Sequence, residues 1–412
     1  MKLWKTFFIV PAFISLALCS CNSRETEKEN TTETIHTKLN MVTSCVEYST
    51  LGAGNEDGYY YIDYSNSDGS TGYIRYIDYN TASDIPLTTQ IASENDDDTS
   101  ESYLESTIGG GTLGVLPSKL LYLRCGSPVF YEKYGENALP AIYIMNLDGS
   151  DRKLLLQGKS NEEYSTTVAS DDSNIYFLYK QTTPIGETDV EAKEYIGRLN
   201  INTGHLETLI SIPYGSRILG VYENQVILDC IRALPSQNYT VQEELLRFNV
   251  DTLSLESIDL WDTSDTIMYC YVCDSSLLKI NLTNRQFLIT PLGSDSSTQV
   301  IDGKDIFLEK ESSVWFPSYY DGYFFCQGSV GSQIWAINLM DGEKTSIDMT
   351  YYNSDKDSAQ PFEICSENKT SFLLKGNAQI TDMGFTTYQY VLINKSDYLS
   401  NNQSYRCISP IN

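Results

Sequence analysis

One short pattern recurs along this chain and constrains its fold more than any other feature. An apolar strand leads to an Asn or Asp, and a polar turn and a second apolar strand follow, as in IYIMNLDGSDRKLLL around Asn146. The seven anchor residues are Asp78, Asn146, Asn200, Asn249, Asn281, Asn338 and Asn394. Successive anchors are separated by 68, 54, 49, 32, 57 and 56 residues. Self-similarity at a spacing of about 50 residues indicates a repeat architecture.

The anchor has a physical role, because Asn and Asp bond their own backbone ahead of a turn while Gly or Asn supplies the positive φ of a tight hairpin. Each unit also has an earlier strand, such as NQVILDC from residue 224. Every unit therefore reads as strand, variable loop, strand, hairpin, strand, which is typical of a β-propeller blade. Seven anchors predict an all-β, seven-bladed propeller. The 32-residue gap and the strand-like segment VIDGKDIFLEK from residue 300 keep six and eight blades as alternatives.

The end of the chain predicts how the ring closes. Only 18 residues follow Asn394, too few for another full unit. The last blade is therefore expected to borrow a strand from MVTSCVEYST at residues 41–50, which would lock the ring. Cys45 and Cys407 lie near the two ends of the folded region and would come close together in a closed ring.

The first 40 residues predict where the protein is located rather than how it folds. Lys2 and Lys5 precede an apolar run from Phe7 to Leu18, which is the pattern of a secretory signal peptide over residues 1–20 and is too short for an ordinary membrane span. Leu18-Cys19-Ser20-Cys21 resembles the bacterial lipobox, and this resemblance implies that Cys21 is diacylated and becomes the new N-terminus. Ordinary secretion with cleavage near Ser20 is the alternative. The polar residues after the lipidated cysteine, within 21–40, should form a disordered tether.

The repeat units resemble the TolB-like and DUF5050-type propellers of bacterial lipoproteins. DGYYYIDY from residue 57, YIRYIDYNT and AIYIMNLDGSDRKLLL carry the likeness, which extends over about residues 45 to 400. It implies one propeller domain over residues 41–412. The TolB likeness also implies protein contacts on a propeller face, although propellers host many unrelated activities.

Composition excludes some partners and cofactors. The net charge of −27 would repel phosphate backbones, so nucleic acid is not expected as a partner. The chain has only two histidines, His36 in the tether and His205 in a turn, which disfavours a zinc or Ser-His-Asp hydrolase. Cys270 and Cys273 have CxxC spacing but no second pair, and side chains three apart on a strand point to opposite faces. No metal, cofactor or catalytic residue is predicted.

Three polar segments suggest sites but are better read as loops. SNSDGSTG at 65–72 differs in register from a sialidase Asp box, and NLDGSD at 146–151 lacks the spaced carboxylates of an EF-hand. Both are expected to be hairpin turns. The acidic run ENDDDTSE at 94–101 is expected to be a solvated loop, with a weak cation site as the alternative.

Long insertions are the best place to look for a ligand site, since propeller loops carry function. Ser127 to Pro140, Gln181 to Glu194 and Ala233 to Glu243 each link an early strand to the anchor strand of their unit, so they should emerge on the same face. With VWFPSYYDG from residue 314 they could form an aromatic and acidic surface, or their aromatics could be buried between blades. Aromatic surfaces suit protein hot spots or sugar rings.

Two functions follow from these features. The first is a monomeric, non-catalytic binding or scaffold propeller, anchored by lipid to the extracytoplasmic face of the bacterial cell membrane, that engages a protein or glycan ligand. The alternative is a carbohydrate-binding or carbohydrate-cleaving propeller that uses carboxylate side chains as acid and base.

Overall fold

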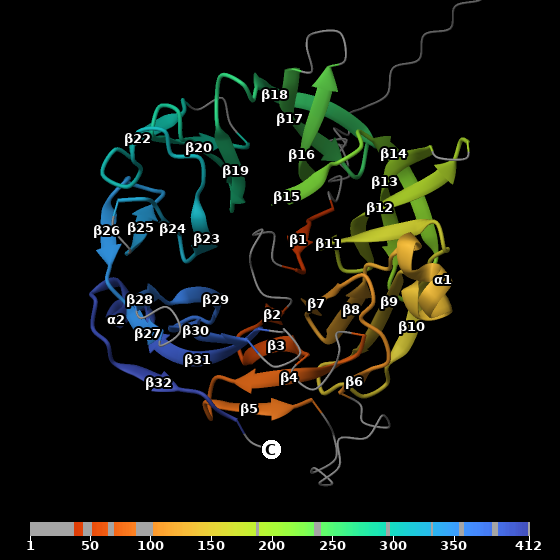
Figure 1. The fold of residues 1–412 in the computed structure, drawn as a ribbon, viewed down its shortest axis with the longest axis horizontal. Helices are drawn as coiled ribbons and strands as arrows, with labels where there is room; N and C mark the ends of the chain where they lie inside the picture. The colour runs from red at the N-terminus through yellow and green to blue at the C-terminus, as the bar shows by residue number, and fades with distance from the viewer. Residues whose placement is uncertain are drawn as a thin grey trace, which may run out of the picture. The chain divides into compact units, whose positions relative to one another are not determined.

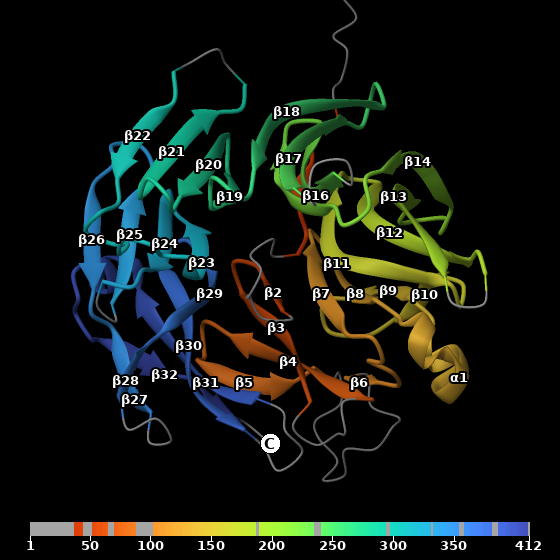
Figure 2. The same cartoon turned by 45° about the horizontal axis from the view of Figure 1, so that its top comes forward.

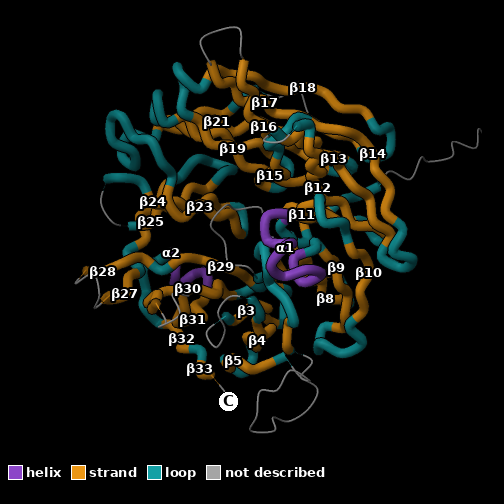
Figure 3. The backbone as a smooth tube through the Cα atoms, turned by 45° about the vertical axis from the view of Figure 1, so that its right-hand side comes forward, coloured by secondary structure: helices purple, strands orange, loops and turns teal. Residues whose placement is uncertain are grey.

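The computed structural model describes residues 37–43, 52–64, 70–87, 102–186, 189–234, 240–293, 297–330, 333–353, 358–380 and 386–410. These residues form a seven-bladed β-propeller, which confirms the predicted fold and blade number (Figure 1). Strands dominate the described chain, and its helical segments are short (Figure 3).

Each blade is a four-stranded antiparallel sheet from one continuous stretch of chain, and its strands are lettered A to D from the ring's centre outward. Blade 1 comprises β2 (Ala53–Gly54), β3 (Gly58–Asp63), β4 (Gly72–Asp78) and β5 (Ser83–Pro86), and blade 2 comprises β7 (Gly111–Leu116), β8 (Lys119–Arg124), β9 (Ala141–Asn146) and β10 (Lys153–Gln157). Blade 3 comprises β11 (Glu162–Ser170), β12 (Asn174–Pro184), β13 (Val190–Asn200) and β14 (Leu206–Ile212). Blade 4 comprises β15 (Arg217–Tyr222), β16 (Gln225–Leu234), β17 (Thr240–Asn249) and β18 (Ser254–Asp262).

Blade 5 comprises β19 (Met268–Cys273), β20 (Ser276–Asn281), β21 (Gln286–Pro291) and β22 (Gln299–Asp302). Blade 6 comprises β23 (Trp315–Tyr320), β24 (Tyr323–Gln327), β25 (Ile334–Asn338) and β26 (Lys344–Ile347). Blade 7 comprises β29 (Glu363–Glu367), β30 (Ser371–Ile380), β31 (Thr386–Asn394) and β32 (Tyr405–Cys407). The remaining elements are β1 (Asn40–Met41), β6 (Tyr103–Leu104), β27 (Thr350–Asn353), β28 (Ser358–Pro361), β33 (Ser409–Pro410), η1 (Pro128–Phe130), α1 (Tyr131–Tyr134), η2 (Gly135–Ala138) and α2 (Lys395–Leu399).

The ring closes differently from the expectation. Of the segment expected to complete blade 7, only residues 41–43 are described, and Met41 pairs with Ala169 at the inner edge of blade 3. Blade 7 instead takes β32 from the chain after its own anchor, and β33 then pairs in parallel with β5 of blade 1. The expectation that blade 7 borrows a strand from residues 41–50 is therefore wrong. Cys407 is an exposed free thiol, while Cys45 lies outside the described residues.

The N-terminal segment, residues 37–43, starts at the turns of blade 4 and then passes between the inner strands of blades 2 and 3. Val42 donates its backbone N–H to Val168 (2.9 Å) and accepts from Val115 (3.2 Å). Gly114 of β7 permits this approach, because a Cβ there would lie 2.5 Å from a methyl group of Val42. The chain thus fills part of the ring's centre before blade 1 begins (Figure 1).

The anchors act as predicted, with one exception. Asn200 accepts hydrogen bonds from the backbone of Asn202 (3.1 Å) and Thr203 (3.0 Å), and Gly204 takes the positive φ of the turn. Six anchors end a C strand, but Asn281 ends the B strand of blade 5. This shift of one strand explains the 32-residue gap, and the segment near residue 300 is strand D of that blade.

The core lies between blades rather than within them. Seven clusters of buried apolar side chains are found in the described residues, one for each pair of neighbouring blades. In the cluster between blades 7 and 1, Leu373 and Tyr390 pack against Tyr59 and Ile77, so packing closes the ring as well. Fully burying one such side chain contributes about 1.5–3 kcal/mol.

Candidate binding face

Antiparallel connection gives the ring two distinct faces. The A–B and C–D turns of a blade lie on one face, called the AB face here, because neighbouring strands run in opposite directions. The B–C loops and the connections to the next blade lie on the other, the BC face. The three predicted insertions are all B–C loops, of blades 2, 3 and 4, so the prediction that they emerge together is confirmed.

The B–C loop of blade 2 folds into the helical turns η1, α1 and η2. Pro128 starts the first turn, and Gly135 ends α1 with a φ of 56°. Below the loop, the buried guanidinium of Arg124 donates to the carbonyls of Leu139 (2.8 Å) and Glu136 (3.3 Å). This support holds Val129 out in solvent, where its side chain is 85% exposed.

The insertions of blades 3 and 4 are mostly strand rather than loop. β12 and β13 each have 11 residues, and β16 and β17 each have 10, so both pairs extend past their flanking strands. β11 pairs with β12 only as far as Gln181, and β15 pairs with β16 only as far as Asp229. The extensions are called arms here: 182–184 with 190–192, and 230–234 with 240–244 (Figure 2).

Exposed large apolar side chains are concentrated on the BC face. Among the described residues, those at this face in blades 2 to 4 are Val129, Phe130, Tyr131, Ile185, Val190, Tyr214 and Ile231. Trp315 and Tyr388 lie at the same face in blades 6 and 7, and Trp315 is the exposed part of the predicted aromatic segment at 314. At the AB turns the exposed residues of this kind are Leu253 and Met340.

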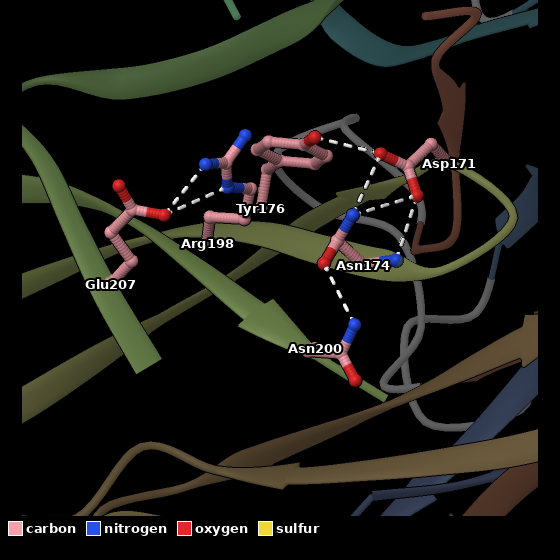
Figure 4. A network of polar contacts seen from close by, with 6 residues as sticks. All are labelled: Asp171, Asn174, Tyr176, Arg198, Asn200 and Glu207. Carbon is pink, nitrogen blue, oxygen red and sulfur yellow. Dashed lines mark hydrogen bonds and ion pairs between the residues drawn. The ribbon is translucent and has the colours of Figure 1, made fainter. Parts of the chain in front are cut away.

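On the AB face, polar side chains mainly stabilise their own turns. Asp171 accepts from the backbone of Ser173 and Asn174 at 2.7 Å each and from the hydroxyl of Tyr176, also at 2.7 Å (Figure 4). Asn174 in turn accepts from the anchor Asn200 at 3.3 Å. These contacts join the A–B and C–D turns of blade 3.

A cavity of about 270 Å³ lies on the AB face where the N-terminal segment meets blades 1 to 3. Asn40, Asn55, Pro117 and Asp171 contribute to its lining. The side-chain oxygen of Asn55 accepts from the backbone of Asp57 (2.9 Å), and Asp171 is engaged as described above. Two of the polar side chains that line the cavity are therefore already engaged in stabilising turns.

A buried carboxyl pair lies between blades 4 and 5, below the blade 4 arm. Arg217 donates to Oδ2 of Asp229 at 2.8 Å, and Asp229 is 2% exposed. Glu243 lies on the neighbouring strand, diagonal to Asp229 and on the same side of the sheet. Burial, then the negative charge of Asp229, raises the pKa of Glu243 to about 8, against the opposing effect of Arg217. Oδ1 of Asp229 is buried and accepts no hydrogen bond, so a proton held on Glu243 and shared with Asp229 would supply the missing donor.

Sequence reasoning missed this pair and the supporting Arg217. The available signal was charged residues inside apolar strands, in QVILDC and QEELLRF. Glycoside hydrolases flank the scissile bond with both carboxyl groups, whereas Asp229 is 2% exposed and closed off from a sugar in solvent. The pair therefore offers no open acid–base site for the predicted carbohydrate-cleaving alternative.

Other candidates are placed largely as expected. His205 is exposed in a C–D turn, and Cys270 and Cys273 are buried on opposite faces of β19, in two different apolar clusters. Residues 146–151 form the C–D turn of blade 2, where Ser150 donates to Asp148. Cys21, His36, residues 65–69 and the run at 94–101 lie outside the described residues.

Within the described residues, no three His, Cys, Asp or Glu side chains converge as metal ligands would. No helix in that part of the chain has both the length and the apolarity to span a bilayer.

Comparison with known proteins supports the fold and no more. No family model matches the chain, and no curated protein matches it. Among solved structures, the β-propeller domain of the Trilobed protease from Pyrococcus furiosus, described as having an open velcro topology, is similar with a TM-score of 0.50 and 11% identity. The match covers 90% of this chain and 98% of that one.

Two further propellers overlap less well. An oligogalacturonate lyase in complex with manganese has a TM-score of 0.48 and 13% identity, over 88% of this chain and 98% of that chain. TolB from Acinetobacter baumannii has a TM-score of 0.37 and 10% identity, over 86% and 77%. The propeller fold that the TolB resemblance implies is confirmed by the seven sheets of the structure itself and by the match with a TM-score of 0.50. Similarity at this level carries no conclusion about substrate or partner.

Proposed function

We propose that this chain is a lipid-anchored, extracytoplasmic propeller of the TolB-like or DUF5050 type in the bacterial cell envelope, and that it binds a partner on its BC face without catalysis. The observation that carries the proposal is that the N-terminal segment contacts the AB face, while the arms extend from the BC face. Thr37 donates to Asp251 (2.6 Å) and Leu39 to Glu223 (2.8 Å), both in turns of blade 4 on the AB face. The chain therefore joins the ring on the face opposite the arms.

This arrangement suits a tethered binding protein. A lipid on Cys21 would be joined to Thr37 by 15 residues, whose extended length is about 50 Å. The described chain begins at Thr37 on the AB face, so its start lies on the side of the ring opposite the arms and exposed apolar side chains of the BC face. Two acyl chains give stable membrane attachment where one would be marginal.

Lipid labelling in a bacterial host tests the anchor. The full chain should incorporate an alkyne-tagged fatty acid and should leave the membrane fraction with detergent but not with high salt. Cys21→Ser should abolish both labelling and retention. Cys19→Ser, two residues away, is the matched control and should behave like the natural chain. An unlabelled chain, or a Cys21→Ser variant that is still retained, would refute the lipid anchor.

A glycan array and a turnover screen on the same purified chain test the non-catalytic part. The expected result is neither sugar binding nor bond cleavage. Tight binding of one glycan, or its cleavage, would replace the proposal with the carbohydrate alternative.

A further inference from the structure

The arm of blade 4 presents an unpaired strand edge on the BC face. β16 pairs with β17 from Gln225 to Leu234, but its pairing with β15 stops at Asp229. No described strand pairs with the inner edge of β16 over residues 230–234. On the outer side, Thr263 donates its backbone N–H to Val241 (3.0 Å), so that side of the arm is partly covered. An open edge of this kind is a template for adding another strand.

Apolar side chains lie beside this edge without being buried by the ring. Ile231 is 59% exposed on the edge itself. Tyr214 is also 59% exposed, in the connection that leads into blade 4, and Ile185 and Val190 lie on the arm of blade 3. We call the inner edge of β16 over residues 230–234 the arm surface, with Ile231 on its blade 5 side and Tyr214 and the blade 3 arm on its blade 3 side.

The charges of the BC face around the arm surface are not balanced. Each exposed cation there has a partner in the chain: Arg232 pairs with Glu244, Lys193 with Glu191 (3.5 Å) and Lys159 with Glu162 (3.5 Å), while Lys133 lies over the ring of Tyr134. In the described part of the chain, exposed carboxylates of this face without a cation include Glu132, Glu136, Asp189 and Asp265. The surplus charge here is therefore negative, like that of the whole chain.

From this geometry we propose that the arm surface binds an extended, lysine- or arginine-rich amphipathic polypeptide segment, which adds as a strand to residues 230–234 of β16. Apolar side chains of the segment contact Ile231 on the blade 5 side of the edge, and the cations that alternate with them lie on the blade 3 side, toward Tyr214 and Asp189. This inference rests on the proposed function, because it names the class of partner for the BC face. A polyanion would be repelled, and a neutral glycan has no strand to add.

Peptide titration onto the full purified chain tests the proposal. The probe is a peptide of about ten residues that alternates valine and lysine, which matches the two-sided side-chain pattern of a strand. It should bind in low salt and weaken as salt rises. The same peptide with glutamate in place of lysine should not bind, and N-methylation along one peptide edge should abolish binding because that edge loses its N–H donors.

Substitutions locate the site. Ile231→Ser should weaken probe binding about tenfold, as expected when an apolar interface contact is truncated. Met340→Ser is the matched control, since Met340 is 90% exposed on the AB face, and it should leave binding unchanged. Bound probe should also slow amide exchange in residues 230–234.

Three outcomes would overturn the inference: equal binding of the glutamate peptide, an unchanged affinity in Ile231→Ser, or self-association of the chain through this edge. None of them affects lipid labelling of Cys21. Failure of the arm surface is therefore distinguishable from failure of the anchored-propeller proposal.

Discussion

The AB and BC faces are built from the same strands, yet their side chains do different work. On the AB face, turn residues such as Asn200, Asn249 and Asp171 accept hydrogen bonds from nearby backbone N–H groups. On the BC face, two hairpins extend past their neighbours and leave apolar side chains such as Ile185 and Ile231 in solvent. The contrast indicates that the AB face chiefly stabilises the ring, while the BC face is free for recognition.

A substitution in the AB turn of blade 3 should have the largest effect on stability. Asp171→Ala removes the acceptor for two backbone N–H groups and for the hydroxyl of Tyr176, a residue that is 1% exposed. The free energy of unfolding should fall by about 3 kcal/mol, from a lost turn cap and an unsatisfied buried hydroxyl. Urea unfolding measures this change, and probe binding at the arm surface should be unaffected.

Asp172→Ala is the matched control for that measurement. Asp172 is the exposed neighbour of Asp171, and its removal should change the unfolding free energy by less than about 0.5 kcal/mol. An equal loss in both variants would show that local charge, rather than the hydrogen bonds of Asp171, stabilises the turn.

The carboxyl pair below the blade 4 arm should make stability depend on pH. The pKa of Glu243 is raised from its ordinary value of 4.5 to about 8, so in this interval the folded chain holds a proton that the unfolded chain has released. The contribution of the pair is present below about pH 4.5 and is lost as pH rises to about 8. The surroundings of Glu243 are Arg217, Asp229, Arg232, Glu244, Asp259, Trp261, Cys270 and Lys279.

Glu243→Gln tests this dependence, because an amide can donate to Asp229 at every pH. The variant should match the natural chain at pH 5 and unfold at a higher urea concentration at pH 8.5. The same substitution at Glu191, an exposed residue of the blade 3 arm, should leave the pH profile unchanged. A natural chain whose stability rises between pH 5 and 8 would contradict the shared proton.

The outer three strands of the blades were predictable from sequence, because an Asn or Asp anchor and a turn mark where strand C ends. The innermost strands were not, since β7 and β11 contain Gly, Ser and Thr and have no anchor. The partner of the N-terminal strand was also wrong, because pattern identifies a strand but not the edge to which it binds. Thr43 contacts Val168, 125 residues away, through a hydrogen bond that no local signal encodes.

The candidate site also has one part that the sequence predicted and one part that it did not. The common face of the three insertions followed from chain order alone, which fixes the direction of each strand. The Asp229–Glu243 pair depends on the register between β16 and β17, where Asp229 lies opposite Leu245 and diagonal to Glu243. A shift of one residue would turn one carboxyl to the other side of the sheet, and sequence did not determine that register.

The smallest stability effect is expected at the exposed apolar residues of the arms. Ile231→Ser should change the free energy of unfolding by less than about 0.5 kcal/mol, since this side chain is 59% exposed and buries little area in the ring. Ile227 lies four residues earlier on the same strand and is fully buried, so Ile227→Ser should destabilise the chain by at least about 3 kcal/mol through a cavity and a buried hydroxyl. Urea unfolding of both variants measures the two free-energy changes on the same scale. If Ile231→Ser were as destabilising as Ile227→Ser, the arm would be part of the core and the distinction between the two faces would fail. A near-neutral result means that folding does not require an apolar residue at this position, which leaves recognition as its role.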